Sequence, residues 1–144
     1  MIIQICGAFV AVFTMAIITS LPRKFLWMAG TIAAISWFVY LVCDYYGAGI
    51  GMSVFTATFV ISFISHLLAR GFKAPVTMFL IPGILPLVPG VNTYRIAYYV
   101  IAKDGAKDSF YLNATLTIAG MIAIAVFIVD TVFRIYVTVR RKKP

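Results

Sequence analysis

Long apolar runs without a charged side chain constrain this chain more than any other feature. The runs 2–21, 25–43 and 50–68 contain no aspartate, glutamate, lysine or arginine. Each is close to the roughly 20 residues that cross a bilayer as a helix. Only 11% of the 144 residues are charged, against about 25% in soluble domains. Because so few charges cannot cover a globular surface, most of the surface must face a lipid bilayer.

The sequence therefore predicts an all-α integral membrane protein with about five transmembrane helices in one transmembrane domain, 1–144. Its 63% hydrophobic residues leave no stretch for a separate soluble domain. The first run has no basic residue before it, unlike a signal peptide, and is predicted to be a retained span. The predicted segments are 2–21, 25–43, 50–68, 74–102 (broken by proline and glycine) and 109–134, followed by a basic tail, 135–144.

Basic residues gather in three short clusters between or after the apolar runs. They are Arg23 and Lys24; Arg70 and Lys73; and Arg140, Arg141, Lys142 and Lys143. Cytoplasmic loops carry an excess of such charges. Five crossings of the cell membrane (the inner or plasma membrane) would place all three clusters in the cytoplasm and the N-terminus on the outer side. If the fourth segment were only re-entrant, the tail would lie opposite the other two clusters. The net charge of +8 does not indicate nucleic-acid binding, because the basic residues form no amphipathic face with interleaved aromatics.

The fourth segment contains the strongest functional signal, three prolines within eight residues. Pro82, Pro86 and Pro89 lack an N–H, so the sequence predicts that the carbonyls four residues earlier lose their helical partners. A lipid-facing helix cannot leave such groups bare, so this segment should be packed inside protein or line a wet cavity. Broken helices form the substrate sites of many secondary transporters. The alternative is a kinked structural helix.

A polar group follows the prolines directly. Asn92 or Thr93 is predicted to cap a new half-helix running to about residue 102, with Arg95 in its first turn. The N–H groups there favour an anion, whereas a cation is disfavoured unless a carboxylate joins it. The alternative is that Arg95 reaches out to the lipid headgroups. The predicted substrate-binding residues are Pro82, Gly83, Pro86, Pro89, Gly90, Asn92, Thr93, Tyr94 and Arg95.

Two further ionisable residues are candidates for proton coupling. His66 shares a helix face with Ser62 and Arg70, and ionisable groups inside membranes are functional candidates. Asp130 precedes Arg134 by four residues, which favours an intrahelical ion pair over a coupling-ion site.

The remaining motifs indicate little chemistry. Cys6 and Cys43 lack metal-ligand spacing. Both would fall near the outer ends of their helices, where they either form a disulfide or pack as two small side chains. The sequence predicts no metal, no cofactor and no enzymatic activity.

The run from Arg70 to Pro75 and on through residues 81–90, with Tyr94 beyond it, resembles the threonine/serine exporter family. Its Pro-Leu-Val-Pro-Gly core, at 86–90, is a fairly specific motif. The resemblance extends to the Leu21–Lys24 turn and the basic tail. More specifically, the chain resembles the short type of this family, which corresponds to its C-terminal half and occurs as a separate small subunit. It implies an exporter subunit for small polar carboxylates, amino acids or a dicarboxylate such as succinate, that works with a larger membrane subunit of the same family.

Three functions remain open from the sequence. The chain is predicted to be the small subunit of a two-component secondary exporter, because a five-helix bundle without an internal repeat has nothing to move against. The alternatives are a non-transporting membrane scaffold and a self-sufficient homo-oligomeric channel. Small residues spaced for close helix contact, Gly30 with Ala34 and Ala119 with Ala123, suit packing in a membrane.

Overall fold

The computed structural model describes residues 1–103 and 105–141, which form helices joined by short links. The helices are α1 (Ile2–Ile18), α2 (Arg23–Tyr45), α3 (Gly49–Phe72), α4 (Thr77–Ile84), the 3₁₀ turn η1 (Leu85–Leu87), α5 (Gly90–Ile101) and α6 (Gly105–Arg141). Three of them, α2, α3 and α6, are long and apolar enough to cross a membrane. The pair made by 77–87 and 90–101, bent by 48°, is a fourth candidate span. This confirms the predicted all-α membrane fold with a broken fourth segment.

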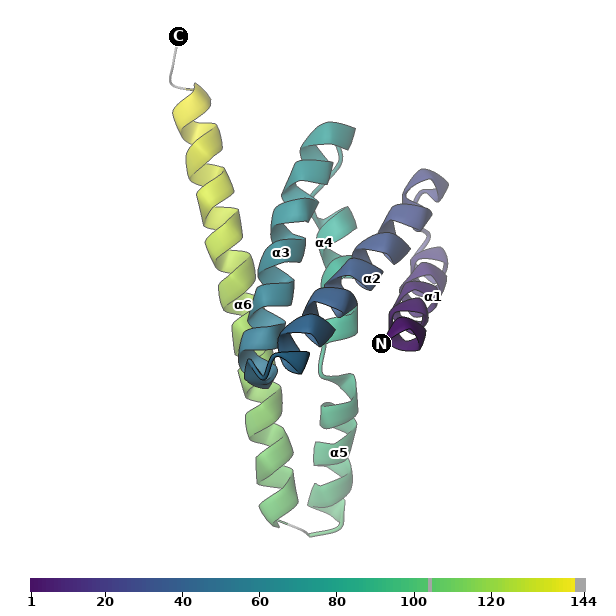
Figure 1. The fold of residues 1–144 in the computed structure, drawn as a ribbon, viewed down its shortest axis with the longest axis vertical. Coiled ribbons are helices and arrows are strands. Elements are labelled where there is room, and N and C mark those ends of the chain that lie inside the picture. The colour runs from purple at the N-terminus through teal and green to yellow at the C-terminus, as the bar shows by residue number, and fades with distance from the viewer. Residues whose placement is uncertain (104, 142–144) are drawn as a thin grey trace.

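The chain runs back and forth between two ends of the molecule (Figure 1). Helix α2 packs against α1 on one side and α3 on the other, and α3 packs against α6. Helix α4 packs against both α2 and α3, and α5 lies against α6. The α1–α2 link, the α3–α4 link and the C-terminal end of α6 lie toward one end, and the α5–α6 link lies at the other (Figure 1). The first end, called here the basic end, therefore carries the links that contain or adjoin Arg23, Lys24, Arg70 and Lys73.

Two element bounds differ usefully from the predicted segments. Helix α1 has 17 residues, or about 25 Å at 1.5 Å per residue, and ends at Ile18 because the chain turns at Ser20, whose φ is 57°. Helix α6 does not stop near residue 134 but continues to Arg141, so most of the predicted tail is helical. Lys142 and Lys143 lie outside the described residues.

Aromatic packing near the basic end holds α2, α3 and α4 together. Phe25, Ile32, Ile61, Ala69 and Phe79 form a buried core cluster. The rings of Phe25 and Phe79 meet edge to face, with centroids 5.4 Å apart, a geometry that aromatic pairs favour. This core fixes α4 against α2 and α3. In the break that follows, Leu87 is buried and Val88 is half exposed.

The turn between α2 and α3 depends on glycine. Gly47 and Gly49 both have φ of +75°, a conformation that costs glycine little and other residues more. The chain can therefore reverse within three residues, from the end of α2 at Tyr45 to the start of α3.

Candidate functional site

Prolines interrupt the fourth segment as predicted, and local hydrogen bonds repair part of the break. Pro82 lies inside α4, Pro86 lies in η1, and Pro89 precedes α5. The N–H of Val88 donates to the Leu85 carbonyl over 3.3 Å, so this carbonyl, predicted to lose its partner, gains a shorter-range one. The backbone extends at Val88, with ψ of 130°, and α5 then starts in a new direction.

Neither Gly83 nor Gly90 has a positive φ, so the backbone angles of the break do not require glycine at these two positions. Gly83 is buried, and a Cβ there would lie 2.8 Å from Cγ2 of Ile61 and 2.9 Å from Cγ2 of Ile32. Its absent side chain therefore lets α4 approach α2 and α3. A Cβ at Gly90 would meet nothing within 4 Å, so sterics do not require glycine at that position.

A cavity of about 200 Å³, called here the break cavity, lies beside the interrupted segment. Helix α2 contributes two aromatic residues, Trp37 and Tyr40, whose rings stack with centroids 5.0 Å apart. The indole N–H of Trp37 is buried and has no hydrogen-bond partner among residues 1–103 and 105–141. The remaining lining residues are Val54, Pro86, Leu87, Val88, Pro89, Gly90, Val91, Asn92 and Ile118. Pro86, Pro89, Gly90 and Asn92 of the predicted site thus come together.

The predicted cap and the position of Arg95 are wrong. Helix α5 begins at Gly90, so Asn92 and Thr93 lie inside its first turn, and no side chain caps it. Thr93 instead donates its hydroxyl to the Pro89 carbonyl over 2.9 Å. The helix starts earlier than predicted because Pro89 and Gly90 can occupy its first positions, which need no intrahelical N–H bond.

Arg95 lies in the second turn of α5 and contacts α6. Its Nη1 donates to the Tyr111 hydroxyl over 3.3 Å, and its guanidinium carbon is 5.2 Å from the centre of that ring. Residues three and four apart share a helix face, so Arg95 follows the cavity-lining Val91 and Asn92 by one turn. It stands near the break cavity without lining it, and Tyr94 beside it is exposed.

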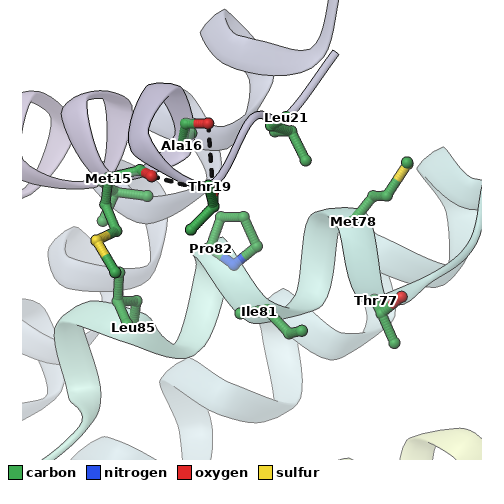
Figure 2. A pocket seen from close by; sticks show the side chains of 10 residues that line it. Met15, Ala16, Thr19, Leu21, Thr77, Met78, Ile81, Pro82 and Leu85 are labelled. Atoms are coloured by element: carbon green, nitrogen blue, oxygen red, sulfur yellow. Dashed lines mark hydrogen bonds between the residues drawn. The ribbon is translucent and has the colours of Figure 1, made fainter.

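Pro82 belongs to a different cavity, a groove of about 320 Å³ between α1 and α4. Figure 2 shows Met15 and Thr19 of the α1 end facing Pro82 and Leu85. The hydroxyl of Thr19 donates to the carbonyls of Met15 and Ala16, so the groove offers mainly apolar surface. It is better suited to apolar packing than to a charged ligand.

Four ionisable side chains from α3 and α6 meet near the basic end, in what is called here the charge cluster: His66, Arg70, Asp130 and Arg134. Nε of Arg134 donates to Oδ2 of Asp130 over 2.7 Å, which confirms the predicted intrahelical ion pair. Oδ1 of the same carboxylate lies 3.8 Å from Nε2 of His66, too far for a hydrogen bond. The sequence did not predict this approach of His66 to Asp130.

Phe133 orients the charge cluster. Its ring stacks on the His66 imidazole, with centroids 4.4 Å apart and planes 6° apart. The Arg70 guanidinium carbon lies 4.7 Å from the centre of the same ring. His66, Arg70 and Arg134 line a cavity of about 460 Å³ with Phe133 and Thr138. His66 is thus the buried member of a cluster whose arginines are exposed.

The sequence did not predict that Trp37 and Tyr40 of α2 line the break cavity. Trp37 and Tyr40 are ordinary aromatics of a predicted span, and nothing in their spacing relates them to the break.

Cys6 and Cys43 are both free, so the structure shows no disulfide between α1 and α2.

Comparison with known families places nearly the whole chain in one of them. Residues 4–132 match the family model described as "Threonine/Serine exporter, ThrE". No curated protein and no solved structure shows detectable similarity to the chain. The match begins in α1, includes the broken segment, ends within α6, and agrees with the multi-pass helical fold. The chain is therefore a multi-pass membrane protein that belongs to the threonine/serine exporter family.

Proposed function

We propose that this chain is the small subunit of a two-component secondary exporter for small polar carboxylates. Its substrates would be threonine and serine or a dicarboxylate such as succinate. The observation that carries the proposal is the break cavity, which places a buried, unpartnered indole N–H beside interrupted backbone in a chain of an exporter family. Substrate sites of secondary transporters form at broken helices of this kind.

The break cavity suits a small ligand with polar ends. Its volume of about 200 Å³ is below the roughly 300–1,000 Å³ of pockets for drug-sized ligands. The Trp37 N–H is a donor without an acceptor function, and the Asn92 amide offers both donors and an acceptor. A carboxylate would satisfy the indole N–H, whose burial without a partner otherwise costs about 1–3 kcal/mol.

Arg95 would collect the carboxylate at the approach to the cavity. It is the one cation of α5 and lies a single turn beyond Asn92 on the same face. Tyr111 holds its guanidinium by a hydrogen bond and a cation–π contact, which leaves other N–H groups of the fork to bind a carboxylate. Thr93 and Tyr94 would flank this approach, and Pro82 and Gly83 would act indirectly by placing the break.

The charge cluster would couple transport to protons. His66 is a residue that can change charge near neutral pH, and its nearest carboxylate, Asp130, is shared with Arg134. Protonation of His66 would create a second ion pair on Asp130 and compete with Arg134. Such a competition between α3 and α6 would supply a two-state element for alternating access.

A larger membrane subunit of the same family would cover α5. None of the 12 residues of α5 is buried, although this helix borders the proposed site. Val91, Tyr94 and Tyr98 are more than half exposed, and the aromatic hydroxyls among them suit a protein surface better than pure lipid. A partner subunit there would also provide the second body that a rocking mechanism needs.

Export assays on cells that express this chain with a larger relative test the proposal. Together the two should release threonine, serine or succinate into the medium, and the chain alone should not. Trp37→Phe should lower export about tenfold or more, because a hydrogen bond to a charged group contributes about 1.5–3 kcal/mol. Trp27→Phe is the matched control, since Trp27 lies on the same helix, is 67% exposed and packs on α1. No release of any small carboxylate by the well-expressed pair would contradict the proposal.

A further inference from the structure

Helix α3 carries a row of residues that joins the break cavity to the charge cluster. Val54, Thr58, Ser62 and His66 follow one another at intervals of four residues and so lie along one ridge of the helix. Val54 lines the break cavity, and His66 approaches Asp130. The two hydroxyls, Thr58 and Ser62, are the positions between these two features.

Both hydroxyls are buried and have spare hydrogen-bonding capacity. Thr58 is 0% exposed and Ser62 is 1% exposed, and neither side-chain oxygen has a hydrogen-bond partner in the described parts of the chain. Several threonines in other helices behave differently. Thr14, Thr115 and Thr117 each donate to the carbonyl four residues earlier over 2.8 Å. The row on α3 therefore keeps its hydroxyls available, at a cost of about 1–3 kcal/mol for each one left unpaired.

The spacing of the row fits water. Four residues of helix rise about 6 Å, which is close to two O–H···O hydrogen bonds of about 2.8 Å end to end. One water can thus bridge Thr58 to Ser62, and another can bridge Ser62 to His66. A hydroxyl both donates and accepts, so alternating hydroxyls and waters can pass a proton along without a net change in the row. Alanine, which occupies the buried positions 57 and 69 of the same helix, would lack this capacity.

We propose that Thr58, Ser62 and His66 form a hydrated path that carries protons between the charge cluster and the break cavity. A proton that binds His66 from the basic end is matched by one that His66 releases to the water at Ser62. The transfer then continues by Thr58 to the cavity, and one proton leaves for each that enters. The charged groups around His66 are Arg70 on α3 and Asp130 and Arg134 on α6. The use of this path for export depends on the proposed function, but the path itself does not.

Cysteine labelling tests whether the row meets water. In the full-length chain with Cys6→Ser and Cys43→Ser, Thr58→Cys and Ser62→Cys are treated in membranes with a small charged thiosulfonate. This reagent needs the thiolate and therefore water at the thiol. Because the row is closed to bulk solvent in this structure, reaction reports its opened, hydrated form. Both row cysteines should react at least tenfold faster than Ala57→Cys, which is equally buried on another side of α3. Equal rates would overturn the hydrated path.

Proton movement tests what the path carries. In vesicles that contain the complete exporter and a trapped pH indicator, export should be accompanied by proton flux. Thr58→Val and Ser62→Ala, which keep the volume nearly unchanged, should lower that flux at least fivefold. Ser53→Ala removes another buried, unpartnered hydroxyl of α3 that lies off the row, and the flux should stay normal. Export without proton flux, or normal flux in both row variants, would overturn the proton path. If the vesicles export nothing while the row cysteines label, the proposed function fails and the hydrated path stands.

Discussion

Gly83 lies where α4 meets α2 and α3, and its lack of a side chain sets the depth at which the broken segment packs. The nearest atoms to a Cβ there belong to Ile61 and Ile32, both fully buried. Branched side chains in a core cannot move aside without shifting the helices that carry them. At the scale of single residues, the site thus depends on the absence of a side chain at Gly83 as well as on polar groups such as the Trp37 indole N–H.

Gly83→Ala is expected to destabilise the protein by about 1–3 kcal/mol, the usual cost of overpacking a core. Thermal unfolding in mild detergent measures this as a lower midpoint. Gly120→Ala is the control: a Cβ at Gly120 meets nothing within 4 Å, and alanine is the better helix former, so the midpoint should hold or rise. Equal midpoints for Gly83→Ala and the unchanged protein would show that α4 can shift freely.

Arg95 is predicted to act on substrate capture. Arg95→Ala should abolish most export at unchanged membrane abundance, and Arg95→Lys should keep only part of it, because lysine retains the charge but lacks the planar fork. Tyr111→Phe removes the 3.3 Å hydrogen bond and keeps the ring under the cation, so its loss should be smaller than that of Arg95→Ala. If Arg95 only reaches the headgroups, all three variants will export normally, since an exposed charge contributes about 1 kcal/mol or less.

The element that decides the site is the broken pair of α4 with η1 and α5. Proline alone predicts a kink, but the direction of the chain after the break follows from packing. Helix α4 is held in the aromatic core with Phe25, and α5 is held along α6 through Arg95 and through Tyr99, whose ring stacks on Tyr111 with centroids 5.5 Å apart. The two halves of the broken segment, α4 and α5, are therefore held by different partners, and the break cavity lies beside the join between them.

Pro86→Ala is expected to reduce export by closing part of the break. Alanine restores an N–H that can donate to the Pro82 carbonyl four residues earlier, which favours a continuous helix. Pro75→Ala lies in the α3–α4 link, outside the break, and should leave export unchanged. Export rate and membrane abundance need to be measured together for both variants. Normal export by Pro86→Ala would mean that packing, rather than this proline, maintains the break.

At the scale of the whole molecule, the path of the chain brings the α1–α2 link, the α3–α4 link and the C-terminal end of α6 to one end (Figure 1). Alternate directions of α1, α2, α3, the α4–α5 pair and α6 produce this arrangement, as five crossings would. From the positive-inside rule, and with Arg23, Lys24, Arg70 and Lys73 at that end, we propose that it faces the cytoplasm. The α5–α6 link, with Lys103 and Lys107, lies at the opposite end and would face outward.

A fluorescent reporter that matures only in the cytoplasm is expected to be bright when fused after residue 144. The same reporter fused after Lys103, in the α5–α6 link, should stay dark. Both fusions need to be shown in the membrane by immunoblot. A dark fusion after residue 144 at normal abundance would remove the proposed orientation, and bright signals from both would indicate that α6, the one helix between the two fusion points, does not cross the membrane.

The sequence by itself determined that the chain resides in a membrane, that its helices number about five, that the fourth is broken, and that the family is one of exporters. The first three follow from local properties: run length, absence of charge, and prolines without N–H groups. The family follows from the resemblance carried by the motif at 81–90. It also determined the Asp130–Arg134 pair, because residues four apart on one helix are neighbours wherever the helix lies. Distances along a single helix need no knowledge of the fold.

Only the tertiary structure decided which helices face one another. It brought His66 of α3 to Asp130 of α6, placed Trp37 of α2 beside the break, moved Pro82 into a separate groove and set Arg95 against Tyr111. In a membrane, apolar side chains suit both lipid and protein contacts, so the pattern that reveals the buried face of a soluble helix is nearly absent. Helix facing is then set by close contacts such as the fit of Gly83 between Ile32 and Ile61, which no periodicity records.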